Sequence, residues 1–153
     1  AEWAERAQRF TQALQDLSSI LIELGFLEKT LSLPNQVVTY QDSCHLRNVM
    51  RVSTEPRQLI QAIDGVTYRE MANADRCCGS AGIYNLIQPE MSTNILTEKM
   101  RHAKMTNATT IVTSNPGCLL QMKLGVEQEG LTERVRVVHI ADLLHEAIEN
   151  ENT

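Results

Sequence analysis

Short runs of β-branched residues alternate with helical patterns along most of this chain. The strand-like runs cover residues 37–40, 66–71, 109–113 and 135–139, and the helical patterns cover residues 56–63, 89–104, 118–128 and 142–149. This alternation is typical of right-handed strand–helix–strand units, which place neighbouring strands in parallel. We therefore predict an α/β fold with an open parallel sheet of about four strands and helices on both faces.

An amphipathic helical pattern precedes the first strand. Gly25 is suited to ending this helix, and its apolar stripe has alternating spacings of four and three: Trp3, Ala7, Phe10, Leu14, Leu17, Leu21 and Leu24. We predict an N-terminal amphipathic helix within residues 1–30, followed by one domain over residues 34–149. We expect the stripe to pack on this domain or on another part of a longer chain, with a partner helix as the alternative. Because the sequence begins with Ala1 inside a helical pattern, we interpret it as part of a longer polypeptide.

Length and charge exclude several classes of protein. The chain has 153 residues, which suits one domain. Its 14 basic and 19 acidic residues give a net charge of -5, whereas a nucleic-acid-binding module carries a basic surplus. The sequence has no apolar run long enough to span a membrane and no signal-peptide pattern. It also has no paired carboxylates, Ser–His–Asp order or phosphate loop that would indicate bond-making catalysis.

Four cysteines follow three of the predicted strands. Cys44 lies four residues past the first strand, Cys77 and Cys78 lie between the second strand and the next helix, and Cys118 lies five residues past the third strand. Because parallel strands end at the same edge of a sheet, we expect these thiols to converge there. The adjacent pair and the lack of a secretory feature argue against a disulfide framework.

Converging thiolates are soft ligands that select iron–sulfur clusters, zinc or Cu(I). His45 and Asp42 are further candidate ligands beside Cys44. Positive charge near the same loops could offset the negative charge of a metal centre, and it is available from Arg47, Arg51 and Arg76. A surface role is the alternative for each of these arginines.

Three motifs together resemble the cysteine-rich CCG domain. They are Asp42-Ser43-Cys44-His45-Leu46, Cys77-Cys78-Gly79 and Gly117-Cys118. The CCG domain occurs in heterodisulfide reductases, in lactate-utilisation proteins and in related oxidoreductases. The longer runs at residues 74–85 and 114–118 look most like the C-terminal part of the iron–sulfur subunits of bacterial glycolate oxidases, and the resemblance covers essentially the whole chain.

This resemblance implies an electron-transfer domain without catalysis of its own. Electrons would pass from a flavin-containing catalytic subunit toward an acceptor such as quinone, in the cytoplasm or at the inner face of the cell membrane. The other expected partner is an N-terminal ferredoxin-like domain of the full-length chain. The resemblance further implies one [4Fe–4S] cluster as cofactor, with four thiolate ligands: Cys44, Cys77, Cys78 and Cys118.

One residue departs from the family pattern. The pattern ends in a C-x-x-C pair, and Asn115 occupies the position of the first cysteine of that pair. Four thiolates match one ligand per iron in an ordinary [4Fe–4S] cluster and argue against the non-cubane clusters of heterodisulfide reductase. Two alternatives remain open. One is a structural zinc site or subunit-docking module on the same thiols, and the other is disulfide attack by Cys77 or Cys78.

Overall fold

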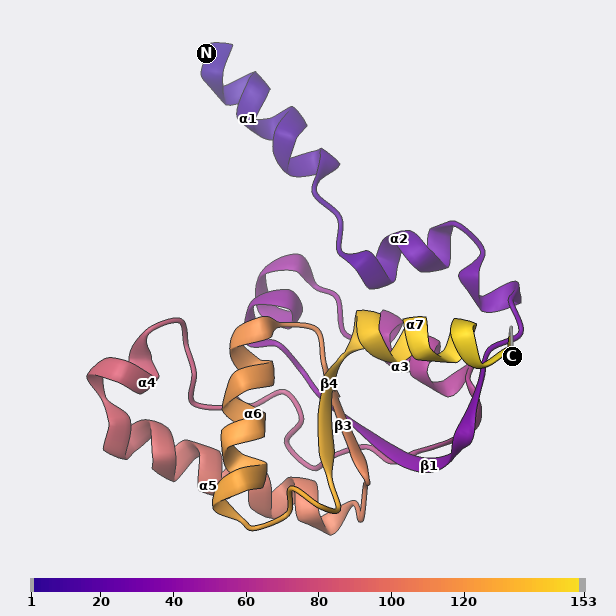
Figure 1. Cartoon of the computed structure of the whole chain (residues 1–153). Helices are drawn as coiled ribbons and strands as arrows, with labels where there is room; N and C mark the ends of the chain where they lie inside the picture. The colour runs from indigo at the N-terminus through magenta and orange to yellow at the C-terminus, as the bar shows by residue number, and fades with distance from the viewer. Residues whose placement is uncertain (1, 152–153) are drawn as a thin grey trace.

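Four parallel strands form one sheet in a computed structural model, which describes residues 2–151 of the chain (Figure 1). The strand order across the sheet is β2-β1-β3-β4, and every neighbouring pair is parallel. This confirms the predicted α/β fold. The bounds of the strands are β1 Ser32–Gln41, β2 Asp64–Tyr68, β3 Thr110–Thr113 and β4 Arg136–His139.

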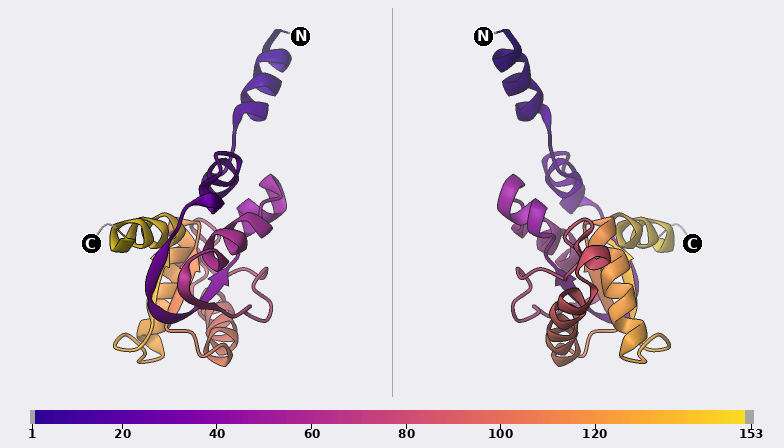
Figure 2. Two further views of the ribbon diagram at one scale, coloured as in Figure 1. Left: turned by 90° about the vertical axis from the view of Figure 1, so that its right-hand side faces the viewer. Right: turned by 90° about the vertical axis from the view of Figure 1, so that its left-hand side faces the viewer.

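Helices cover both faces of this sheet (Figures 1 and 2). Neighbouring residues of β3 point to opposite faces, so Val112 joins one hydrophobic core and Ile111 joins the other. The core around Val112 includes residues of α3 (Thr54–Gln61) and α7 (Ile140–Glu151). The core around Ile111 includes residues of α5 (Pro89–Met105) and α6 (Pro116–Gln128). These four helices match the predicted ones, with ends shifted by a few residues.

The N-terminal amphipathic helix expected within residues 1–30 is divided in two. It forms two helices, α1 (Glu2–Ala13) and α2 (Leu17–Glu23). The break occurs because Asp16 caps α2, its side chain accepting a hydrogen bond from the Ser18 amide at 2.8 Å. Helix α1 extends away from the domain in every view (Figures 1 and 2). Residue 1 of the expected segment lies outside the described residues.

The apolar stripe of this segment is mostly exposed to solvent. Trp3 and Phe10 on α1 are 76% and 67% exposed. Leu21 on α2 packs against the core that contains Val112. The stripe of α1 therefore does not pack on the described part of the domain. In residues 2–151, no helix is both long and apolar enough to cross a lipid bilayer.

Three short helices were not predicted. A 3₁₀ turn at Phe26–Glu28 (η1) links α2 to β1, a π-helical turn at Leu46–Met50 (η2) follows Cys44, and α4 (Tyr84–Ile87) precedes α5.

The strand order places a topological switch point between β1 and β3. The chain runs from β1 through α3 to β2 on one side of β1, and β3 then pairs with the other side. Connections therefore diverge from the carboxyl ends of β1 and β3. Open α/β sheets bind their ligands in the crevice at such a point.

Candidate functional site

All four cysteines line one cavity at the carboxyl edge of the sheet. The cavity has a volume of about 310 Å³ and is named here the cysteine cavity. Cys44 reaches it from the segment after β1, and Cys118 reaches it from the first turn of α6, which follows β3. Cys77 and Cys78 reach it from the segment between β2 and α4. The convergence expected from the sequence is therefore present, at the switch point of the sheet.

The four cysteines line the cavity, and two of their sulfur atoms are in contact. The Cys78 Sγ donates a hydrogen bond to the Cys118 Sγ at 3.4 Å, and both residues are buried. Cys44 and Cys77 are half-buried. Within residues 2–151, no group of three or more His, Cys, Asp or Glu side chains is arranged so that it could hold a metal ion as placed. Metal binding would therefore require rotation of these side chains.

Hydrogen bonds between the thiols make their pKa values unequal. The hydrogen bond from Cys78 lowers the pKa of the Cys118 thiol, although burial opposes this effect. The same bond is the largest cause that raises the pKa of Cys78 to about 11. A hydrogen bond with Cys78, together with burial, raises the pKa of Cys77. Cys118 is thus the member of this trio that is most easily ionised, and a metal would displace protons from the other two.

Asn115 positions Cys118 by capping helix α6. Its side-chain oxygen accepts hydrogen bonds from the backbone amides of Gly117 at 2.9 Å and Cys118 at 3.1 Å. Pro116 occupies the first helical position, which favours a helix start. Cys118 consequently lies at the positive end of the helix dipole, which stabilises a thiolate. Asn115 therefore serves as the helix cap and also lines the cysteine cavity.

Gly79 shapes the segment that carries Cys77 and Cys78. Its φ is +99°, and a Cβ atom at this position would lie 2.7 Å from the backbone oxygen of Ser92. The Ser92 hydroxyl donates to the Gly79 carbonyl at 2.9 Å and accepts from the Gln121 amide at 3.0 Å. The Gly79 amide donates to the Cys77 Sγ at 3.3 Å. This buried network fixes the backbone beside both cysteines.

Hydrogen bonds tie the three cysteine-bearing segments together. The Gln41 side chain donates to the backbone oxygen of Arg76 at 3.2 Å, next to Cys77. The Asp42 amide donates to the Ala74 carbonyl at 3.2 Å. The Tyr40 and Ser114 hydroxyls are hydrogen-bonded at 2.8 Å and link β1 to the segment that follows β3. The relative positions of the thiols are therefore fixed by contacts outside the cavity.

Asp42 is occupied by ion pairs and is not positioned as a metal ligand. Its buried carboxylate accepts two hydrogen bonds of 2.9 Å from Arg57 and one of 3.2 Å from Arg47. Arg57 also pairs with Glu70. The hydrogen bond to Glu70 is the largest cause that raises the pKa of Arg57, so this guanidinium remains charged.

The other polar residues singled out from the sequence have different positions. His45 lines the cysteine cavity beside Cys44. None of the three arginines expected to offset negative charge lines this cavity: Arg47 pairs with Asp42, Arg51 is exposed, and Arg76 lines a neighbouring groove.

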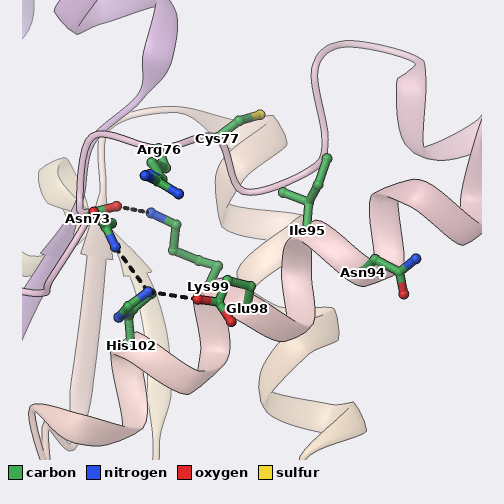
Figure 3. Close-up of a pocket in the computed structure, with 8 residues that line it drawn as sticks. All are labelled: Asn73, Arg76, Cys77, Asn94, Ile95, Glu98, Lys99 and His102. Atoms are coloured by element: carbon green, nitrogen blue, oxygen red, sulfur yellow. Dashed lines mark hydrogen bonds and ion pairs between the residues drawn. The ribbon is translucent and has the colours of Figure 1, made fainter.

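That groove has a volume of about 420 Å³ and lies between the segment before Cys78 and helix α5 (Figure 3). Cys77 contributes to the walls of both the groove and the cysteine cavity. The groove contains a residue that sequence reasoning missed, the buried Lys99. The helical pattern could have indicated that Lys99 is buried, because Lys99 follows Leu96 by about one turn and precedes Met100, and both of these residues lie on the buried face of α5.

A family comparison matches the part of the chain that contains this site. The family model described as "Cysteine-rich domain" (CCG) matches residues 38–123, a segment that includes all four cysteines.

Comparison with curated proteins finds relatives over nearly the whole chain. The "Probable glycolate oxidase iron-sulfur subunit" of Bacillus subtilis (strain 168) is 62% identical over 147 residues, which cover 95% of this chain and 33% of that protein. "Lactate utilization protein A" of Shouchella clausii is 28% identical over 144 residues, covering 94% of this chain and 59% of the relative. "Uncharacterized protein YkgE" of Escherichia coli (strain K12) is 31% identical with the same coverage. The chain thus spans about one third of the length of the Bacillus subtilis relative and less than two thirds of the others.

Proposed function

Because this chain belongs to the CCG family of cysteine-rich domains, we propose that its four cysteines hold an iron–sulfur cluster and that the domain transfers electrons. The observation that carries this proposal is the single cavity lined by thiols from three separate segments. The name of the 62% identical relative, an iron-sulfur subunit, supports the same cofactor. The proposed ligands are those implied by the sequence: Cys44, Cys77, Cys78 and Cys118.

The name of the 62% identical relative favours a cluster over a single zinc ion. A tetrahedral Zn²⁺ holds every sulfur about 2.3 Å from one point. In a [4Fe–4S] cluster each thiolate binds a different iron, so the ligands surround a larger volume. The four thiols line a cavity of about 310 Å³, and within residues 2–151 no group of them could hold a metal ion as placed, so either arrangement requires their side chains to move. A structural zinc site is the competing proposal, favoured by the close approach of Cys78 and Cys118.

The chain itself would hold the ligands and control their charge. When bound, a [4Fe–4S] cluster supplies one-electron transfer at a potential set by its surroundings. The buried Cys78 and Cys118 form the inner wall of the site, and the half-buried Cys44 and Cys77 form the side nearer to solvent. Electrons would therefore enter and leave on the side of Cys44 and Cys77.

The wider role follows from the relatives and not from this chain alone. In our proposal the domain is part of an oxidase-like complex that oxidises a 2-hydroxy acid such as glycolate. It receives electrons from a flavin-containing subunit and passes them toward an acceptor such as quinone. A ferredoxin-like domain of the full-length chain is a further partner, and the complex works in the cytoplasm or at the inner face of the membrane. The curated names of glycolate oxidase and lactate utilization relatives support this role.

Anaerobic reconstitution of the chain tests the cofactor. The reduced protein is incubated with iron and sulfide, desalted, and analysed for iron, acid-labile sulfide and zinc, with EPR and Mössbauer spectra recorded on the product. We expect iron and sulfide in equal amounts and a cluster spectrum. Stoichiometric zinc binding without cluster assembly would replace this proposal with the zinc site.

Thiol reactivity separates the proposal from disulfide chemistry at Cys77 or Cys78. An attacking thiol needs a lowered pKa, whereas hydrogen bonding raises the pKa of both residues. We expect slow alkylation of the metal-free protein at these two positions near neutral pH. Rapid alkylation of either thiol together with turnover of a disulfide substrate would favour catalysis.

A further inference from the structure

Lys99 is a buried cation in a chain whose other lysines are exposed. Its exposed fraction is 2%, whereas Lys29, Lys104 and Lys123 lie on the surface. It lies in the middle of α5 and points from that helix toward the segment before Cys77 (Figure 3). Burial lowers the pKa of its ammonium group, which reflects the cost of removing a charge from water. Such a residue requires a compensating interaction.

The contacts of Lys99 are with backbone oxygens. Its Nζ donates to the carbonyl of Asn73 at 2.6 Å and to the carbonyl of Ala74 at 3.4 Å. Among the ion pairs of residues 2–151, none joins Lys99 to a carboxylate. These bonds engage two of the three N–H donors of the ammonium group. The thiols of Cys77 and Cys78 and the carboxylates of Asp75 and Asp42 raise the pKa of Lys99 and so oppose the effect of burial.

The position of Lys99 connects two of the cysteine-bearing segments. The Ala74 carbonyl that accepts from Lys99 also accepts from the Asp42 amide, two residues before Cys44. The same segment continues directly into Cys77 and Cys78, and Cys77 and Lys99 line the same groove. Thiolates at these positions would therefore add to the negative charge around Lys99.

We propose that Lys99 is a positioning residue for the metal centre. Its ammonium fixes the segment that carries Cys77 and Cys78, and its positive charge stabilises the added negative charge when the centre is reduced. This inference rests on the proposed function, because it assumes that the cysteines hold a redox-active cluster. It assigns to Lys99 the charge-compensating role that the sequence suggested for the neighbouring arginines.

The test compares reduction potentials of reconstituted variants. Lys99→Met and Lys99→Gln remove the charge, whereas Lys99→Arg retains it. Glutamine keeps an N–H donor for the Asn73 carbonyl. If Lys99→Met does not fold, the potential of Lys99→Gln is therefore the one compared with that of the wild-type protein. Lys104→Met is the matched control, because it removes the same charge from an exposed position on the same helix, where Lys104 pairs with Glu129. Midpoint potentials are measured by EPR-monitored titration, independently of any enzymatic activity.

We expect both neutral variants to be reduced less readily than the wild-type protein. The equilibrium constant for reduction falls at least tenfold, a shift of about 59 mV to more negative potential for a one-electron couple. Lys99→Arg returns the potential toward the wild-type value, and Lys104→Met leaves it unchanged. A wild-type potential in a cluster-bearing Lys99→Gln protein would overturn the role of Lys99 alone. Failure of the wild-type chain to assemble any cluster would overturn the proposed function as well.

Discussion

Cys78 and Cys118 are 40 positions apart in the sequence, yet their sulfur atoms lie 3.4 Å apart in the buried wall of the cysteine cavity. This contact exists because one thiol precedes α4 and the other lies in the first turn of α6, on segments that meet at the carboxyl edge of the sheet. We expect this pair to oxidise before the other thiol pairs in the metal-free protein.

Mild oxidation of the metal-free protein is therefore expected to join Cys78 to Cys118. A bridge between the adjacent Cys77 and Cys78 is strained, because their Cα atoms are about 3.8 Å apart and disulfides usually span about 4.4–6.8 Å. Peptide mapping by mass spectrometry, after alkylation of the remaining thiols, should find Cys44 and Cys77 alkylated. The oxidised protein should take up no iron until it is reduced. A predominant disulfide that contains Cys44 or Cys77 would contradict this pairing.

Removal of the Asp42 carboxylate is expected to destabilise the protein strongly. Asp42→Ala leaves the Arg57 guanidinium without its buried partner, and breaking a buried ion pair in this way costs about 3 kcal/mol. The free energy of unfolding is measured by denaturant titration. Glu146→Gln is the control, because it breaks an exposed pair with Arg136 and should cost less than about 1 kcal/mol. Equal losses of unfolding free energy in the two variants would show that the buried Asp42 pair stabilises the fold no more than the exposed pair does.

Much of the site follows from topology and could be predicted from sequence. The strand runs identified the sheet, and parallel strands necessarily bring their following segments to one edge, so the convergence of Cys44 and Cys118 needed no knowledge of side-chain contacts. The helix break at residues 14–16 was missed because the apolar spacing continues through it, while the local cap made by Asp16 begins a second helix.

Tertiary pairing could not be predicted in the same way. Asp42 is adjacent to the cysteine motif and carries a ligand-type oxygen, but its partner Arg57 is fifteen residues away on α3, and only the packed fold brings the two together. Arg76 and Lys99 line the same groove although they are 23 residues apart, and the buried position of Lys99 on α5 depends on the packing of that helix.

Gly79→Ala is expected to distort the segment that carries Cys77 and Cys78. An added Cβ would approach the Ser92 backbone oxygen to 2.7 Å, and the φ of +99° is unfavourable for alanine. Gly82→Ala is a matched control in the same segment, because its φ is +70° but no heavy atom lies within 4 Å of the added Cβ. The control should lose about 1–2 kcal/mol of stability from backbone strain alone. Gly79→Ala should lose more stability than the control, as measured by thermal unfolding, and should assemble less cluster. An identical effect of the two substitutions would contradict the argument that Gly79 is closely packed against Ser92.

The Arg57–Glu70 pair is expected to make stability depend on pH in the acid range. The hydrogen bond from Arg57 lowers the pKa of Glu70 below its ordinary value of 4.5. The folded state therefore binds fewer protons than the unfolded state in this range, so the contribution is complete above pH 4.5 and is lost as the pH falls through the lowered pKa. Because Glu70 is half-exposed, we expect Glu70→Gln to cost only about 0.5 kcal/mol at pH 7. The difference in free energy of unfolding between the wild-type protein and Glu70→Gln, measured at pH 7 and pH 3, should be smaller at pH 3. A difference that is the same at both pH values would argue against ionisation of Glu70 as its cause.

The most direct test of the proposed metal centre is to replace one cysteine at a time by serine and to measure iron and sulfide content after anaerobic reconstitution. We predict that each variant binds less iron than the wild-type protein and gives a different EPR spectrum. The four substitutions are Cys44→Ser, Cys77→Ser, Cys78→Ser and Cys118→Ser. Ser80→Ala, which changes a buried residue of the same cavity wall, should retain the full cluster. A wild-type cluster in any of the four serine variants would contradict the claim that all four thiols hold one metal centre.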